Sequence, residues 1–326
     1  MKKVILDVRG LQKYYPVRKS FLSSSSDVVH AVEDISFQIR AGETFSLVGE
    51  TGSGKSTVAS MIMRLIEPTA GEIEFDGKNM LTQNRKELRE TRRDIQMIFQ
   101  DPYASLNPRM TVESTVGLPL EQLKISSGKE KRQRVIQLLE TVGLKPAEKI
   151  LDRFPHEFSG GQKQRIGVAR ALALSPKFIV ADEPVSSLDI SIRAQILNLL
   201  KDLKERYNLT YLLIAHDLSV VKYMSDWVCI MYLGRGMELA RVKEFYKKPL
   251  HPYTKSLLSA VPPIHPSIEK KRIKLKGEMP SAINPPSGCL FHTRCPYTEE
   301  KCININPNFM EIRPGHWVSC HRWDEI

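Results

Sequence analysis

A short glycine-rich stretch carries the clearest chemical signal in this sequence. Gly49-Glu50-Thr51-Gly52-Ser53-Gly54-Lys55-Ser56-Thr57 fits the P-loop pattern, in which glycines let backbone N–H groups curve around phosphate oxygens. We expect Lys55 to reach the β- and γ-phosphates of a nucleotide and the Ser56 hydroxyl to ligate Mg²⁺. The stretch therefore predicts a site for a nucleoside triphosphate and Mg²⁺.

A pair of acids follows a run of apolar residues later in the chain. Phe178-Ile179-Val180-Ala181 has the composition of a buried strand, and Asp182 and Glu183 come directly after it. Asp182 can hold the water shell of Mg²⁺ opposite Ser56. Glu183 is placed to accept a proton from the attacking water, a role worth roughly 10² to 10⁴ in rate. With the P-loop, these acids predict hydrolysis of the nucleotide.

A second possible anion site lies between these two motifs. Ser159-Gly160-Gly161-Gln162 leads into Ile166–Leu174, which is predicted to be helical. A Ser-Gly-Gly turn at the start of a helix offers free N–H groups and the positive end of the helix dipole. One nucleotide does not need two phosphate-binding loops. We therefore expect the second loop to serve the γ-phosphate held by another subunit.

The elements that must position these residues alternate between strand and helix. Strands are predicted at three places, Val4–Val8, Asp34–Ile39 and Thr44–Val48. The Ser-rich stretch Ser20–Asp27 is predicted to be an exposed loop. Val58–Ile66 is rich in apolar residues and is predicted to be the helix that opens on the phosphates.

Composition is that of an ordinary soluble protein of about two structural units, with 326 residues, 41% apolar and 26% charged. It excludes a collagen-like, coiled-coil or wholly disordered chain. The apolar run Trp227–Leu233 is far shorter than a membrane span, and Met1–Asp7 is not a secretory signal. We therefore expect a cytoplasmic protein.

The net charge of +11 favours an anionic binding partner, either nucleic acid or the anionic surface of a membrane. The alternative is a solvated basic surface without such a partner.

Cysteines are few but unevenly placed. Four of the five are near the C-terminus, with the spacing C-x5-C-x6-C-x17-C: Cys289, Cys295, Cys302 and Cys320. In a cytoplasmic chain such a group suggests metal ligation before disulfides. Proline is also concentrated there, which indicates a boundary near residue 245. Cys229 lies in an apolar run and is predicted to be a small buried hydrophobe.

Taken together, these motifs resemble those of the nucleotide-binding subunits of ABC transporters, over about residues 4–245. Ser159–Gln162 resembles the family signature, and Arg85–Arg93 suits an exposed helix of the helical subdomain, about 85–170, that carries it. The resemblance implies further site residues: Gln100 of the Q-loop, Asp189 of the D-loop, the switch histidine His216, and Tyr15 (or its neighbour Tyr14) stacking on adenine. It also implies an α/β fold with a P-loop core, an antiparallel β subdomain and a helical subdomain.

Residues 246–326 extend beyond this minimal ATPase. Lys248–Leu257 resembles the C-terminal extension of oligopeptide and dipeptide importer ATPases. In that subfamily, cysteines at similar places ligate a [4Fe–4S] cluster, and zinc or plain thiols remain as alternatives. His292, His316 or His321 could replace a cysteine or lie beside the ligands. We thus expect a small irregular metal-binding extension whose structure is stabilised by its metal.

The resemblance implies one ATPase subunit of a peptide importer, most like the second, F-type, ATPase. It would sit peripherally on the cytoplasmic face of the membrane, paired with a homologous ATPase beneath two integral membrane permeases. An extracytoplasmic solute-binding protein would choose the cargo, and no nucleic acid partner is expected. Nickel or another small solute is the alternative cargo. A soluble ABC ATPase of DNA repair or translation, or an iron–sulfur sensor without transport, are the rival functions.

Overall fold

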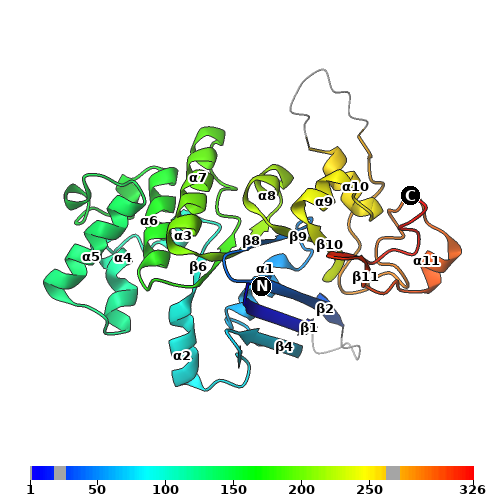
Figure 1. Cartoon of the computed structure of the whole chain (residues 1–326), viewed down its shortest axis with the longest axis horizontal. Helices are drawn as coiled ribbons and strands as arrows, with labels where there is room; N and C mark the ends of the chain where they lie inside the picture. Colours follow the sequence, from blue (N-terminus) through cyan, green and yellow to red (C-terminus); the bar gives the residue numbers. More distant parts are fainter. Residues whose placement is uncertain (1, 18–26, 262–271) are drawn as a thin grey trace. The chain divides into compact units, whose positions relative to one another are not determined.

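The computed structural model describes residues 2–17, 27–261 and 272–326, which form two compact units (Figure 1). Unit 1 combines Met1–Thr82 with Ile214–Ile326, and unit 2 comprises Gln83–Leu213. The loop expected at Ser20–Asp27 lies outside the described residues except for Asp27. The boundaries expected near residue 245 and at about 85–170 stay predictions.

An antiparallel sheet makes up one part of unit 1. Its strand order is β2-β1-β4-β5, with β1 at Val4–Pro16, β2 at Val28–Arg40, β4 at Ala70–Phe75 and β5 at Lys78–Asn79. Side chains of β2 alternate between buried and exposed from Ile35 onward, as expected of a sheet with one covered face. The antiparallel β subdomain expected from the sequence is confirmed.

A second group of paired strands in unit 1 has the order β11-β12-β10-β9-β3. Strand β3 (Thr44–Val48) is wholly buried and parallel to β9 (Trp227–Tyr232), whereas β10 (Arg235–Arg241) is antiparallel to β9. The C-terminal strands β11 (Met310–Arg313) and β12 (His316–Val318) continue this order, with β12 paired to β10. The C-terminal segment is therefore hydrogen-bonded to the unit that contains β3.

The helices of unit 1 are mostly short. They are α1 (Lys55–Ile62), α8 (Leu218–Met224), α9 (Val242–Lys247), α10 (Pro252–Ser259) and α11 (Glu300–Asn304). The helix expected at Val58–Ile66 ends earlier than predicted, because Arg64 adopts a left-handed conformation with φ 50°. Cys229 is only 1% exposed, which confirms its predicted burial.

Unit 2 is mainly helical. Its helices are α2 (Arg85–Asp94), α3 (Pro102–Ser105), α4 (Val112–Gln122), α5 (Gly128–Thr141), α6 (Gly160–Leu172) and α7 (Ile190–Tyr207), with short 3₁₀ turns at Ala147–Lys149 and Pro155–Glu157. Its strands β6 (Ile95–Ile98) and β7 (Phe178–Asp182) are parallel. Strand β8 (Thr210–Ala215) follows β7 in the strand order and belongs to unit 2 as far as Leu213.

Helices α4, α5 and α6 pack against one another through buried side chains such as Leu120, Leu139 and Ile166. In contrast, α2 has no buried residue, as its highly charged sequence predicted. Among the described residues, no helix combines the length and apolar character needed to cross a bilayer.

A buried carboxylate fastens the start of the C-terminal segment. Glu238 on β10 is 0% exposed and accepts hydrogen bonds from the backbone N–H groups of Leu250 (2.9 Å) and His251 (2.8 Å). It also lies 2.7 Å from Nε2 of His316 on β12. Burial lowers the pKa of His251 to about 4, so its neutral Nδ1 accepts from the N–H of Tyr253 at 3.1 Å and caps α10.

We expect Glu238→Ala to destabilise unit 1 by roughly 3–5 kcal/mol, because it leaves buried N–H groups and a buried imidazole without their acceptor. Denaturant unfolding followed by circular dichroism measures the loss. Glu244→Ala, which removes an exposed carboxylate from α9, is the matched control and should unfold like the unchanged protein. Equal midpoints for the two variants would contradict this role of Glu238.

Candidate functional site

The glycine-rich loop, residues 49–54, connects β3 to α1 in a conformation that only small residues permit. Gly54 has φ +99°, and a Cβ there would lie 2.4 Å from the carbonyl oxygen of Ala31. A Cβ on Gly49 would lie 2.2 Å from the carbonyl oxygen of Met231. Both contacts are too close for a real side chain, so the loop can keep this curvature only with glycine at these positions.

The Lys55 ammonium lies inside this loop. Lys55 is 6% exposed, and its Nζ donates to the carbonyl oxygens of Gly49 (2.8 Å) and Glu50 (2.9 Å). It lies 3.2 Å from Oγ of Ser53. Ser56, in the first turn of α1, is exposed. A buried cation beside an exposed hydroxyl at a helix N-terminus is suited to bind a phosphate chain with its metal ion.

The remaining loop residues differ in exposure: Thr51 and Gly52 are exposed, Gly54 is half-buried and Ser53 is buried. Thr57, in the first turn of α1, is half-buried. The exposed tip is therefore the part of the loop open to a ligand.

Two residues of the C-terminal segment hold Glu50 of the loop. The backbone N–H of Glu50 donates to the hydroxyl of Tyr253 at 3.1 Å. One Nη of Arg294 donates to both carboxylate oxygens of Glu50, at 3.1 Å to Oε1 and 3.0 Å to Oε2. The side chain of Arg294 is 8% exposed and that of Glu50 is 31% exposed, so this ion pair is partly shielded from water. The loop is thus fixed by residues that come about 200 or more positions later.

An aromatic cluster supports these two contacts. The ring of Phe291 lies 5.2 Å from that of Tyr253 and 5.4 Å from that of Tyr232, and the two tyrosine rings are 4.9 Å apart. The Arg294 guanidinium lies 5.9 Å from the centre of the Tyr232 ring. Since Tyr253 and Tyr232 are fully buried, the position of Arg294 is set by packing as well as by charge.

Unit 1 also contains Tyr15 and His216. Tyr15 is 37% exposed, with Nζ of Lys13 4.9 Å from its ring centre. The hydroxyl of Tyr14 donates to Glu33 at 2.9 Å, and burial together with Glu33 raises the pKa of Tyr14 to about 12. Tyr14 is therefore engaged within the unit, while the Tyr15 ring is open to a partner. His216 is exposed directly after β8.

Unit 2 brings two of the predicted site residues together. Strands β6 and β7 are parallel, with Ile98 opposite Ala181, so the residues that follow them emerge at the same sheet edge. There the side-chain amide of Gln100 donates to Oε2 of Glu183 at 2.9 Å. Asp182 is 8% exposed, whereas Glu183 is half-buried and has φ 44°. The left-handed conformation directs Glu183 away from the extended path of β7.

The Ser159–Gln162 turn forms the N-terminus of α6. Oγ of Ser159 accepts from the N–H of Gln162 at 3.4 Å, and Oε1 of Gln162 accepts from the N–H of Ser159 at 3.0 Å. Gly161 is buried, and a Cβ there would lie 2.5 Å from Ile192 of α7. Gly160 is half-buried, and Ser159 and Gln162 are exposed. The turn thus presents an exposed helix N-terminus on a rigid support.

The predicted D-loop lies at the start of α7. Asp189 is the N-cap residue of α7 but makes no side-chain capping hydrogen bond. It is exposed, and the apolar side chain of Ile190 beside it is 84% exposed. Both side chains therefore lie at the surface at the start of α7.

The four C-terminal cysteines converge although they are far apart in sequence. Cys289, Cys295, Cys302 and Cys320 line one small cavity, together with His251, His292 and His321. None of the four is in a disulfide. Burial raises the pKa of Cys289 to about 12 and that of Cys320 to about 11. His316 is not in this cavity and pairs with Glu238 instead.

The positions of these side chains do not indicate a binding site for a single metal ion. Among the described residues, no group of three or more His, Cys, Asp or Glu side chains is arranged to hold one metal ion. A zinc site needs all four thiolates on one ion, whereas in a four-iron cluster each thiolate binds a different iron. The described residues thus show four thiols around one cavity but no arrangement that holds a metal ion.

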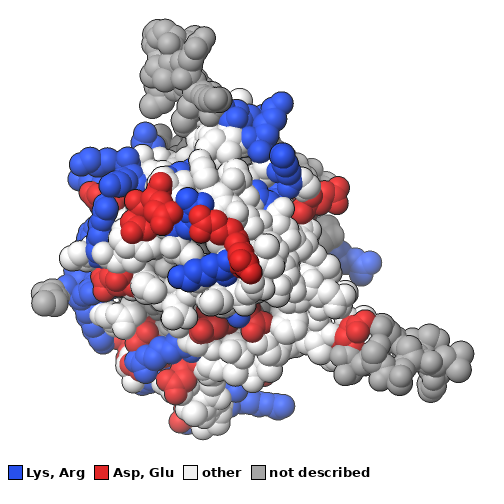
Figure 2. All heavy atoms as spheres, turned by 90° about the vertical axis from the view of Figure 1, so that its right-hand side faces the viewer, with Lys and Arg blue, Asp and Glu red and all other residues white. Residues whose placement is uncertain are grey.

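Positive and negative side chains are mixed on the face of the molecule shown in Figure 2. On this face Lys and Arg side chains are interspersed with Asp and Glu around a broad uncharged area. The net charge of +11 is thus not gathered into one patch on this face.

The sequence motifs did not reveal the residues that fix the loop. Tyr253 belongs to a stretch singled out for its resemblance, but nothing indicated that its hydroxyl binds the loop. Arg294 is separated from Glu50 by 244 positions and gave no signal at all.

Two protein-family models match the chain. The model described as "ABC transporter" matches residues 32–186. The model described as "Oligopeptide/dipeptide transporter, C-terminal region" matches residues 237–302. The first contains the glycine-rich loop and the Ser159–Gln162 turn, and the second contains Tyr253 and Arg294.

Similar proteins extend over almost the full length. The oligopeptide transport ATP-binding protein AppF of Bacillus subtilis is 49% identical, with 98% of each chain covered. A putative oligopeptide transport ATP-binding protein of the same organism, YkfD, is 52% identical over 97% of this chain and 95% of its own. A putative peptide import ATP-binding protein of Brucella ovis is 49% identical, with 98% of each covered.

A solved structure has the same fold. The ATP-binding cassette MJ0796, in a dimeric post-hydrolysis state bound to ADP and Pi, is 31% identical with a TM-score of 0.64. The match covers 73% of this chain and 99% of that one. A P-loop α/β fold of this type is therefore established for the chain.

We expect Arg294→Ala to raise the KM for nucleotide about tenfold, because Glu50 loses the charged partner that fixes the loop. Steady-state phosphate release at varied nucleotide concentration measures KM and kcat separately. Arg294→Lys should restore part of the loss. Arg313→Ala, which removes an exposed arginine of the same segment, should behave like the unchanged protein. An unchanged KM in folded Arg294→Ala would contradict a positioning role.

Proposed function

Because the chain belongs to the ABC transporter family, we propose that it is an ATP-hydrolysing subunit that powers the import of peptides across the cytoplasmic membrane. One observation carries this proposal: 49% identity over 98% of both chains to a protein named for oligopeptide transport. The match of the C-terminal region to oligopeptide and dipeptide transporters supports the same cargo class.

In this proposal the glycine-rich loop of unit 1 binds the phosphates of ATP. Lys55 neutralises charge on the β- and γ-phosphates, and the exposed ring of Tyr15 stacks on adenine. Ser56, Gln100 and Asp182 would hold Mg²⁺, which when bound offsets the charge that develops on the γ-phosphate. The oxygen donors of these side chains suit this metal.

Glu183 is proposed as the base and His216 as a γ-phosphate contact. The hydrogen bond from Gln100 to Oε2 of Glu183 orients this carboxylate. A carboxylate that accepts the proton of the attacking water supports in-line displacement at the γ-phosphate. In this proposal Gln100 would link the metal and the base.

The second half of each site is proposed to come from another ATPase subunit. The exposed N-terminus of α6, Ser159–Gln162, would bind the γ-phosphate held by that subunit. The exposed Asp189 and Ile190 support a contact surface at the start of α7. We propose a heterodimer with a homologous ATPase, in which this chain is the F-type subunit. ATP-driven closure of the dimer would do the transport work.

The membrane assembly follows from the family. Two integral permeases and an extracytoplasmic solute-binding protein would complete the importer, with this chain peripheral on the cytoplasmic face. The two domains would be the ABC nucleotide-binding domain, 1–245, and the C-terminal extension, 246–326.

A [4Fe–4S] cluster is proposed at Cys289, Cys295, Cys302 and Cys320. It is supported by the convergence of the four thiols on one cavity. The segments that carry the cysteines have little regular secondary structure, so a bound cluster would cross-link and stabilise them.

We expect Glu183→Gln to lower ATP hydrolysis roughly 10²- to 10⁴-fold while ATP binding remains. The trapped closed dimer should then co-purify from gently solubilised membranes with a second ATPase and with integral membrane permeases. Glu205→Gln, an exposed change on α7, should leave hydrolysis unchanged. Co-purification of ribosomes or DNA without membrane proteins would contradict transport while leaving the ATPase chemistry intact.

We expect Cys295→Ser to abolish iron and acid-labile sulfide in protein purified without oxygen. The variant should also unfold at lower denaturant concentration, because the C-terminal segment loses the cluster that cross-links it. Cys229→Ala removes the cysteine outside the cavity and should keep the iron. Stoichiometric zinc without sulfide, or full stability of Cys295→Ser, would contradict a structural iron–sulfur cluster.

A further inference from the structure

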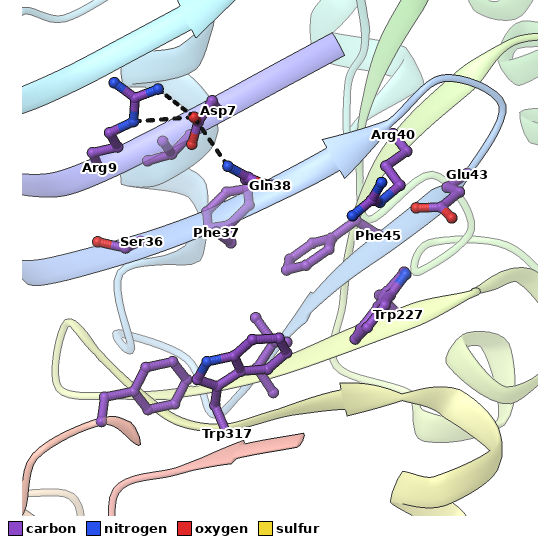
Figure 3. Close-up of a pocket in the computed structure, with 13 residues that line it drawn as sticks. Asp7, Arg9, Ser36, Phe37, Gln38, Arg40, Glu43, Phe45, Trp227 and Trp317 are labelled. Carbon is purple, nitrogen blue, oxygen red and sulfur yellow. Dashed lines mark hydrogen bonds and ion pairs between the residues drawn. The ribbon is translucent and has the colours of Figure 1, made fainter. Parts of the chain in front are cut away.

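A cavity of about 420 Å³ lies within unit 1, away from the glycine-rich loop (Figure 3). Its walls come from β1, β2, β3, β9, β10 and the C-terminal strand β12, together with Glu43 and Phe309. The volume falls within the range of roughly 300–1,000 Å³ that is usual for small-molecule sites. None of the motifs discussed above uses this cavity.

Five of the thirteen residues that line the cavity are aromatic. Phe37 and Phe45 are stacked with ring centres 4.6 Å apart. The rings of Trp227 and Trp317 are 6.3 Å apart and inclined by 51°. Figure 3 shows Phe37, Phe45 and Trp317 around the open space, with Trp227 nearer to its charged end. Such rings suit an apolar group. The Trp227 ring already has a cation at its face, because the Arg241 guanidinium lies 4.7 Å from its centre.

The charged end is formed by the turn between β2 and β3. The N–H of Glu43 donates to the carbonyl oxygen of Arg40 at 3.1 Å, so one tight turn supplies both side chains. Glu43 is 8% exposed. Within the described residues, neither the Glu43 carboxylate nor the Arg40 guanidinium has a hydrogen-bonding or ion-pair partner. Both side chains border the cavity beside Trp227 (Figure 3).

The other carboxylate of the cavity is already satisfied. Asp7 accepts from Nη2 and Nε of Arg9 at 2.6 and 3.0 Å, and from the amide of Gln38 at 3.1 Å. Glu43 differs from Asp7 in this respect, and burying a carboxylate without a partner raises the free energy of the folded protein. A ligand cation that pairs with Glu43 would lower that free energy.

We propose that this cavity binds a free α-amino acid with an aromatic or large apolar side chain. The ammonium group pairs with Glu43, and the carboxylate pairs with Arg40. The side chain lies among Phe37, Phe45 and Trp317. This site is separate from the proposed ATP site and does not depend on it.

The two charges select an α-amino acid over related ligands. Arg40 and Glu43 belong to the same turn, so they match a cation and an anion that are close together in the ligand. An amine lacks the partner for Arg40, and a carboxylic acid lacks the partner for Glu43. In a longer peptide the two terminal charges are separated, and the only other carboxylate of the cavity, Asp7, is occupied by Arg9 and Gln38.

Tryptophan fluorescence tests the proposal, because two of the three tryptophans line the cavity. L-phenylalanine should give a saturable change with a Kd of about 1 mM or lower. Phenethylamine and 3-phenylpropanoate, which each keep one charge, should bind at least about tenfold more weakly. Equal binding of all three probes, or no saturable change with L-phenylalanine, would overturn the proposal.

Two variants assign the binding to the turn. Glu43→Gln and Arg40→Gln should each weaken L-phenylalanine binding about tenfold or more while circular dichroism stays unchanged. Asp202→Asn removes an exposed carboxylate from α7 and should not change the affinity. If one variant fails to fold, the other still decides. Unaltered affinity in a folded variant would overturn the proposal.

Discussion

The contact between Glu50 and the C-terminal segment is the constraint on which the nucleotide site depends. The glycine-rich loop can curve around an anion only because its glycines lack side chains, and this freedom also leaves it without internal support. Support comes from outside the loop, through the hydroxyl of Tyr253 and the guanidinium of Arg294. A loop held in place before the nucleotide arrives loses less conformational entropy on binding.

This dependence explains why the C-terminal extension is built into unit 1 and is not a loose appendage. Glu238 holds the start of α10, which carries Tyr253, and β12 pairs with β10. Phe291, between Cys289 and Cys295 in sequence, packs on the same tyrosines that surround Arg294. The cysteine cavity is therefore connected to the loop through packed side chains. A cluster bound there would stabilise the position of Arg294.

Short-range chemistry was predictable from the sequence, whereas long-range contacts were not. The loop from Gly49 to Thr57, the strand before it and the exposed helix at Arg85–Arg93 each depend on neighbouring residues, and their patterns predicted them. The hydrogen bond between Gln100 and Glu183 was not predicted, because the sequence did not show that the strands before them are neighbours. The pairing of Arg294 with Glu50, and the cavity at Glu43, depend on how distant segments pack. Single residues without periodicity give no signal of such contacts.

Peptide uptake by a reconstituted complex tests the central claim most directly. The chain, with the membrane proteins that co-purify with it, would be placed in vesicles with ATP on the side that carries this chain. Labelled dipeptides and oligopeptides, with the solute-binding protein, would be supplied on the other side. The account predicts ATP-dependent peptide uptake that stops when Glu183 is replaced by glutamine. ATP hydrolysis that moves nickel or another solute but no peptide would contradict it.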